Sequence, residues 1–185
     1  CRYEYDKARI IVREMTELHV LDLVAKGYVT DSVTLAIGYD REVEDSSYDG
    51  EMVLDGYGRI VPKPVHGTMR LSNHTSSTEK IMKVVLQIFD NIVDDRLGVR
   101  RVTISFNNLL DKKDEDVNQF QQMNLFTDYN KVEENKRDEE REKKMQEAVL
   151  KIQDRFGKNA ILKGTNLCEG ATTIERNNQI GGHRA

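Results

Sequence analysis

The chain has 185 residues, of which 38% are hydrophobic and 32% charged, and its 28 basic and 32 acidic side chains give a formal net charge of −4. This length allows one compact core with appended segments, and no apolar run approaches the roughly 20 residues that a membrane-spanning helix needs. The acidic excess lies in residues 111–150, which carry 12 acidic and 8 basic side chains, whereas the rest of the chain carries 20 of each. The net charge therefore does not exclude nucleic-acid binding by a face that concentrates arginine.

The two cysteines, Cys1 and Cys168, lie far apart in the sequence and indicate no disulfide framework, which favours a reducing, cytoplasmic location. The first residues show no signal-peptide pattern. Because the sequence starts with cysteine instead of methionine, we expect it to be a piece of a longer protein.

The chain begins with a predicted helix and a predicted strand. Apolar residues recur at helical spacing between Asp6 and Lys26, and Gly27 is a natural stop. Residues 31–39 then alternate as a half-buried strand. One face of this strand carries Val33, Leu35, Ile37 and Tyr39, and the other carries Ser32, Thr34 and Ala36.

Residues 40–66 are expected to form an inserted loop with a small hairpin, in which Val53-Leu54 and Ile60-Val61 flank a glycine-rich turn. A second strand follows over Gly67–Ser72. The next helix can be capped by Thr75–Ser77, and its apolar stripe is Ile81, Val85, Ile88, Phe89 and Ile92. A third strand is predicted over Val99–Leu109.

The order helix, strand, strand, helix, strand predicts an α+β fold, with an antiparallel sheet packed on one face by two helices and open on the other. We divide the chain into a domain (residues 1–110), a linker (111–135), a helix with a short strand (136–163) and a polar tail (164–185). In the third part the helix is Lys136–Phe156, ended by Gly157, and the strand is Ala160–Leu162.

The open face of this sheet would carry small hydroxyl side chains, arginine at intervals and no carboxylate. Its members are Ser32, Thr34, Ala36, Thr68, Arg70, Ser72, Arg101, Thr103 and Ser105. Short hydroxyls let a phosphate backbone come close to the strands, and arginine supplies a charged fork of donors. Arg100, Lys63 and His66 would extend the same track. Serine and threonine also suit the solvated face of any strand, so the residues alone leave both interpretations open.

Residues 122–126, Gln-Met-Asn-Leu-Phe, form an apolar cluster in a polar, acidic stretch with no helical or strand partner. Apolar residues exposed in such a stretch are usually buried by a partner. The alternative is a chance cluster that packs on the core of the same chain.

Four segments of the chain, 31–39, 66–72, 75–93 and 98–110, resemble the little-finger domain of Y-family translesion DNA polymerases. The segment Val-Arg-Arg-Val-Thr-Ile-Ser-Phe at 99–106 is similar to the last strand of that domain, where paired basic residues touch DNA phosphates. Within the family the chain resembles UmuC-like, ImpB/MucB/SamB-type UV-damage repair proteins. Residues 122–126 take the place of their clamp-binding peptide, and 170–177 and 179–183 resemble their tail.

The resemblance implies a DNA-binding fragment of a lesion-bypass polymerase that acts in DNA repair and the SOS response. The pattern of the open face and the resemblance together assign contacts with the DNA backbone to Thr34, Thr68, Arg70, Ser72, Arg100, Arg101, Thr103 and Ser105. The resemblance assigns the sliding clamp to Gln122, Met123, Asn124, Leu125 and Phe126, whose apolar members would fill hydrophobic pockets. The alternative is an interaction module that docks the clamp or a recombinase filament and has little DNA affinity.

The chain departs from the family pattern in two ways. Polymerase chemistry belongs to a palm domain whose carboxylates hold Mg²⁺, so we expect no catalytic residue or cofactor here, and we interpret Asp94-Asp95 as solvated. The little finger normally starts with a strand that this chain lacks. The open sheet edge would be covered by residues 160–163 or by a second copy of the chain. Metal binding is not expected, because His19, His66, His74 and His183 have no zinc-site spacing.

Overall fold

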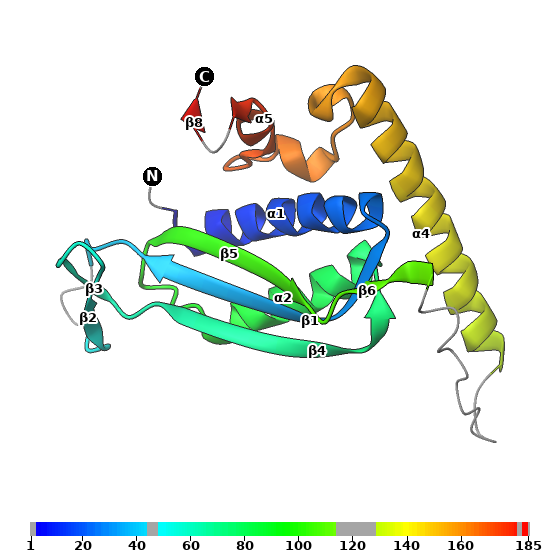
Figure 1. Ribbon diagram of the computed structural model, residues 1–185. Coiled ribbons are helices and arrows are strands. Elements are labelled where there is room, and N and C mark those ends of the chain that lie inside the picture. The colour runs from blue at the N-terminus through cyan, green and yellow to red at the C-terminus, as the bar shows by residue number, and fades with distance from the viewer. Residues whose placement is uncertain (1–2, 44–47, 114–128, 181–182, 185) are drawn as a thin grey trace.

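The computed structural model describes residues 3–43, 48–113, 129–180 and 183–184. Two helices and a sheet form the main body (Figure 1). Its elements are α1 (Tyr5–Ala25), β1 (Tyr28–Tyr39), β2 (Met52–Leu54), β3 (Ile60–Pro62), β4 (Val65–Thr75), α2 (Thr78–Ile92), β5 (Val99–Asn107) and β6 (Leu110–Asp111). A C-terminal part follows, with α4 (Tyr129–Phe156), the short 3-10 helices η1 (Lys158–Ala160) and η2 (Gly164–Leu167), α5 (Thr173–Asn177), β7 (Gln179–Ile180) and β8 (His183–Arg184).

The main sheet has the order β4-β1-β5, with every neighbouring pair antiparallel, and β6 pairs with the first residues of β1. Helices α1 and α2 pack on one face of this sheet. The predicted α+β class is therefore confirmed, and so is the β2–β3 hairpin, which extends beyond one end of the sheet (Figure 1).

The core lies between the sheet and the two helices, and it follows from the alternation of β1. Val33, Leu35 and Ile37 are at most 1% exposed, and they pack against the buried side chains of α2 and α1. Gly67 of β4 faces α2 so closely that a Cβ atom there would lie 2.7 Å from Cγ2 of Ile88. Burial of these apolar side chains is the main force that holds the helices on the sheet.

The ends of all three main strands differ from the sequence prediction. β1 starts at Tyr28 instead of Asp31 and has a bulge between Thr30 and Ser32. At this bulge the one hydroxyl proton of Thr30 is shared between two acceptors, Asn107 O (2.6 Å) and Ser32 O (3.0 Å). β4 runs from Val65 to Thr75 and so exceeds the predicted 67–72. β5 ends at Asn107, because Asn108 takes a left-handed conformation with φ 51°.

The prediction for the C-terminal part is partly wrong. Helix α4 starts at Tyr129, before the predicted Lys136. Residues 160–162 form no strand: η1 ends at Ala160, and Ile161 and Leu162 face α1 instead of the sheet edge. The C-terminal segment from η1 to α5 lies along the side of α1 that points away from the sheet (Figure 1).

A buried carboxylate holds this C-terminal segment on α1. Glu14 is only 2% exposed. Its Oε2 atom accepts hydrogen bonds from Thr172 N (2.8 Å) and Thr172 Oγ1 (3.2 Å). Its Oε1 atom accepts from Thr173 N (3.3 Å) and Asn166 Nδ2 (3.2 Å). All four donors are satisfied by one side chain, which compensates for removing a charge from water.

Helix α4 contacts the start of α2 through polar groups. Glu142 accepts from Ser77 Oγ at 2.6 Å and from Glu79 N at 3.1 Å, so it supplements the Ser77 cap of α2. Gln146 Nε2 donates to Ser76 O and Thr78 Oγ1, both at 2.9 Å. A carboxylate at a helix N-terminus is also favoured by the helix dipole.

The outer edge of β5 is paired at one point. Tyr3 and Val99 exchange two backbone hydrogen bonds, of 2.9 and 2.8 Å. In the described ranges no further strand pairs with this edge, and coverage by a second copy of the chain stays a prediction.

Candidate nucleic-acid interface

Strand register determines which side chains share the open face, the face of the sheet opposite α1 and α2. Each row across the three strands takes one residue from β4, one from β1 and one from β5. The rows are Arg70–Ser32–Asn107, Thr68–Thr34–Ser105 and His66–Ala36–Thr103, and Arg101 lies beside Gly38 in the next position. None of these positions carries a carboxylate, as the sequence predicted.

The exposure of these side chains is uneven. Thr68, Arg70, Arg101, Thr103 and Ser105 are exposed, as is Ser72, which lies where the pairing of β4 with β1 becomes irregular. Thr34 is half-buried between its neighbours, and Ser32 is only 4% exposed. The accessible surface of the face is therefore formed mainly by its two outer strands.

A hydrogen-bond chain crosses the middle of the open face. Asn107 Nδ2 donates to Thr34 Oγ1 at 2.9 Å, and the hydroxyls of Thr34 and Thr68 lie 2.8 Å apart. Each hydroxyl has one proton to donate, and one of the two protons is used in the mutual bond. The pair therefore keeps one hydroxyl proton for an acceptor outside the chain, such as a phosphate oxygen.

Three arginines elsewhere in the body are held by aspartates, although Arg13 Nε of α1 also has no hydrogen-bond partner within the described ranges. Arg9 is paired with Asp90 at 2.9 Å, Arg59 with Asp55 at 2.6 Å and Arg96 with Asp94 at 2.8 Å. Among the described residues, no hydrogen bond or ion pair reaches the guanidinium groups of Arg70, Arg100 and Arg101. Charge and donors on this part of the surface are therefore available to an anion.

Arg70 and Arg101 lie at opposite ends of the open face. Their positions on β1 are Ser32 and Gly38, which places them roughly 20 Å apart along the strands and roughly 10 Å apart across them. The missing side chain of Gly38 leaves room for Arg101, because a Cβ atom at Gly38 would lie 3.3 Å from Cβ of Arg101.

Arg100 does not belong to the rows of the open face. It is the extra residue of a bulge, because Gly38 pairs with Arg101 and Tyr39 pairs with Val99. Arg100 lines a groove at the outer edge of β5 together with Arg101, Met15 and Arg176. Arg100 and Arg101, which the sequence placed on one track, therefore share this groove, and Arg101 alone of the two also lies in the rows of the open face.

The acidic pair Asp94-Asp95 provides no catalytic arrangement. The guanidinium of Arg96 donates to both Asp94 oxygens and holds the pKa of that carboxyl below its usual range. Asp95 is exposed. In the described part of the chain no three or more His, Cys, Asp or Glu side chains gather where they could hold a metal ion.

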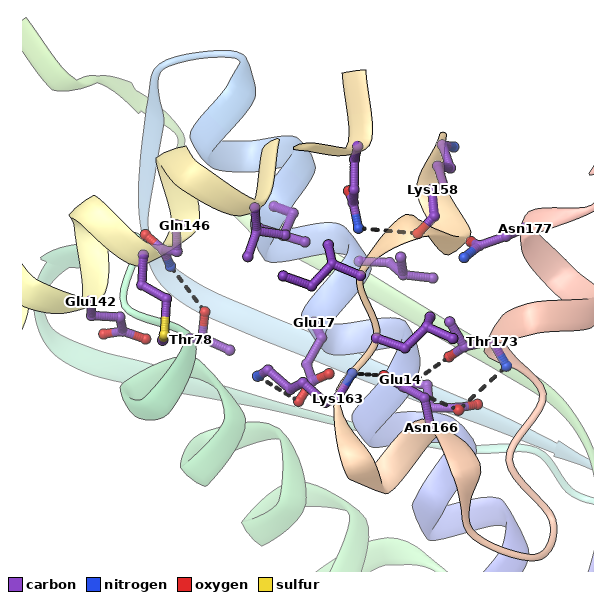
Figure 2. A pocket seen from close by; sticks show the side chains of 17 residues that line it. Glu14, Glu17, Thr78, Glu142, Gln146, Lys158, Lys163, Asn166, Thr173 and Asn177 are labelled. Carbon is purple, nitrogen blue, oxygen red and sulfur yellow. Dashed lines mark hydrogen bonds and ion pairs between the residues drawn. The ribbon is translucent and has the colours of Figure 1, made fainter. Parts of the chain in front are cut away.

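A cavity of about 250 Å³ lies between α1, α4 and the C-terminal segment (Figure 2). Its acidic groups already have partners: Glu14 binds the C-terminal segment, Glu17 binds Lys163 at 2.9 Å, and Glu142 caps α2. The rest of the lining is largely aliphatic, from Leu18, Leu21, Val149, Ile161 and Leu162. We interpret this cavity as a packing gap beneath the C-terminal segment, because it presents no nucleophile paired with a base.

The predicted clamp residues Gln122, Met123, Asn124, Leu125 and Phe126 lie outside the described residues. Sequence reasoning missed the two carboxylates that organise the C-terminal part, Glu14 and Glu142. Both lie on helices among other charged residues, and no local pattern distinguishes them. No helix in the described ranges is long and apolar enough to cross a membrane.

The fold and the open face define a class of domain. Two helices cover one face of an antiparallel sheet and arginines and hydroxyls lie on the other, which is the arrangement expected from the resemblance to the little-finger domain. The profile of the impB/mucB/samB family C-terminal domain matches residues 2–125, and the chain belongs to this family. Helix α4 and the segment that follows it lie beyond the matched residues. No curated protein matches the chain.

Proposed function

We propose that this domain binds the phosphate backbone of duplex DNA with the open face of its β4-β1-β5 sheet and is tethered to the sliding clamp by residues 122–126. The observation that carries the DNA contact is the position of Arg70 and Arg101 on a sheet face whose rows contain no carboxylate. Arg9, Arg59 and Arg96 are held by aspartates, whereas no ion pair from the described residues reaches Arg70 or Arg101. Because the chain belongs to a family of Y-family polymerase domains, DNA is the anion that we expect these arginines to bind.

The proposed contact reads the backbone and not the bases. The two exposed arginines bind phosphates at separate points, and the hydroxyls of Thr68, Thr103 and Ser105 donate to phosphate oxygens between them. Their separation of roughly 20 Å corresponds to about six steps of 3.4 Å along one DNA strand. Binding of this kind releases counterions and weakens steeply as salt is added.

The test is titration of the chain with blunt duplex DNA over a range of salt concentrations. Arg70→Ala and Arg101→Ala together remove two phosphate contacts. The plot of log K against log salt is therefore expected to become shallower, with a slope less negative by about 2. Arg155→Ala is the matched control, because it removes one exposed arginine of α4. A double variant whose salt slope equals that of Arg155→Ala would show that the open face is not the contact surface.

The clamp tether is proposed from the sequence. Replacing Leu125 and Phe126 by alanine is expected to abolish binding to the clamp and to leave duplex binding unchanged, while the arginine variants are expected to do the reverse. Retained clamp affinity would contradict the assignment of this peptide. Clamp or recombinase-filament binding without salt-dependent duplex binding would favour the alternative, an interaction module with little DNA affinity.

A further inference from the structure

The short β2–β3 hairpin exposes four large apolar or aromatic side chains to solvent. Leu54 is 70% exposed, Tyr57 85%, Ile60 65% and Met52 40%. Leu54 and Ile60 form a cross-strand pair, so they project from the same side of the hairpin, directly beside the turn that carries Tyr57. Contiguous apolar patches on a monomer commonly mark a binding site.

The turn of the hairpin is held in one conformation before any partner arrives. Asp55 Oδ1 accepts from Tyr57 N at 2.8 Å and from Arg59 N at 3.0 Å, and Asp55 Oδ2 accepts from Arg59 Nε at 2.8 Å. The pKa of Asp55 is lowered to about 2, mainly by the hydrogen bond that its side chain accepts from the side chain of Arg59. A side chain presented by such a turn loses little conformational entropy when it binds.

The aromatic ring at the turn is supported on one side. The guanidinium of Arg59 lies 4.9 Å from the centre of the Tyr57 ring, and the exposure of Tyr57 leaves the ring accessible from elsewhere. A rigid aromatic ring with an arginine behind it is an arrangement on which nucleobases stack.

The position of the hairpin beside the open face favours nucleic acid as the occupant, and its paired acids do not oppose this ligand. Two hairpin acids are neutralised within the hairpin, Asp55 by Arg59 and Glu51 by Lys63 at 2.7 Å. Lys63 leads directly into β4, whose exposed His66, Thr68 and Arg70 continue onto the open face. A DNA strand that follows β4 toward the hairpin therefore meets no unpaired acid from Glu51 or Asp55 on the way.

We propose that the β2–β3 hairpin binds an unpaired base of single-stranded DNA adjoining the duplex, with the base stacked on Tyr57 and flanked by Leu54 and Ile60. The bases of an intact duplex are already stacked on each other, so the ligand is a single-stranded extension. This inference rests on the proposed contact between the open face and duplex DNA. The chain from Gly58 to Pro64 spans at most roughly 25 Å, so an extension of about ten nucleotides reaches the hairpin.

The test compares two probes, a blunt duplex and the same duplex with an oligothymidine 5′ extension of about ten nucleotides. Tyr57→Ala is expected to weaken binding of the extended probe roughly 5- to 150-fold, the loss typical of one stacked base, and to leave blunt-duplex binding unchanged. Tyr57→Phe keeps the ring and is expected to bind like the unaltered chain. Tyr28→Ala, at the opposite end of β1 and 39% exposed, is the matched control.

Failure of this inference can be told from failure of the proposed function. Equal affinity of Tyr57→Ala and Tyr28→Ala for the extended probe would overturn the stacking site, whatever the arginine variants do to the blunt duplex. Self-association that is lost in Leu54→Ser with Ile60→Ser, together with unchanged DNA affinities in Tyr57→Ala, would also overturn it and assign the hairpin to a protein contact.

Discussion

Substitution of Glu14 by glutamine tests whether one side chain holds the C-terminal segment on α1. Each carboxylate oxygen of Glu14 accepts two hydrogen bonds from the segment, at 2.8 to 3.3 Å. Glutamine keeps the shape of the side chain, but its NH₂ group must face two donors wherever it is placed. The substitution therefore removes two hydrogen bonds to a charged acceptor and brings donors together.

The magnitude follows from these contacts. Hydrogen bonds to charged groups are worth about 1.5–3 kcal/mol each, and rotation of the Thr172 hydroxyl recovers part of the loss, so we expect the docked segment to be destabilised by about 2–4 kcal/mol. If the segment opens locally, amide exchange in residues 164–178 is expected to accelerate roughly 30- to 1,000-fold. The amides of β1 are expected to keep their protection, because the core lies on the other side of α1.

Hydrogen exchange followed by mass spectrometry measures this difference peptide by peptide. Glu17→Gln is the matched control: it changes the same chemical group on the same helix and removes only the ion pair with Lys163, whose side chain is 56% exposed. Such a pair contributes under about 1 kcal/mol. Exchange in residues 164–178 that is equally fast in the two variants would refute the role of Glu14 as the anchor.

Two further predictions concern the main body. Gly67→Ala is expected to lower the free energy of unfolding, measured in urea, by about 1–3 kcal/mol, because the new Cβ atom would lie 2.7 Å from Ile88 Cγ2. Gly56→Ala is the control, because a Cβ atom there meets no atom within 4 Å. Equal stability of the two variants would contradict the close approach of β4 to α2. Asp90→Asn is expected to cost about 0.5–1 kcal/mol near neutral pH, because both partners of its ion pair with Arg9 are partly exposed. The hydrogen bond from Arg9 lowers the pKa of Asp90 in the folded state. The stabilisation from this ion pair is therefore complete above the unfolded-state pKa of about 4, and it disappears as the pH falls through the lower folded-state pKa. A difference in unfolding free energy between Asp90→Asn and the parent chain that persists at pH 2 would contradict this prediction.

The main body was predictable because burial imposes a period on its sequence. Val33, Leu35 and Ile37 alternate with small polar residues, and this pattern determines both the strand and the face that packs on the helices. The same period placed Arg70 and Arg101 on the open face. A hairpin between residues 53 and 61 followed from the glycine-rich turn.

The remaining features depend on contacts that leave no periodic signal. The bulge at Gly38 and Tyr39 shifts the register by one residue and leaves Arg100 without a partner on β1. Glu142 caps a helix that starts more than 60 residues before it, and neither partner predicts the other. Ile161 and Leu162 have the apolar character of a strand, but they cover α1 because the segment after them is fixed by Glu14.

The contact between Glu14 and Thr172 joins residues 158 positions apart. Because of this separation, we expect the main body to fold before the C-terminal segment docks on it. A chain made from its N-terminus can complete the sheet and both of its helices before Thr172 has been synthesised. The outer side of α1 must then wait for the last part of the chain, and closing so long a loop is slow compared with forming a hairpin. Docking of the C-terminal segment is therefore the step of assembly that a truncation before Thr172 would abolish, while the sheet and its two helices could still form.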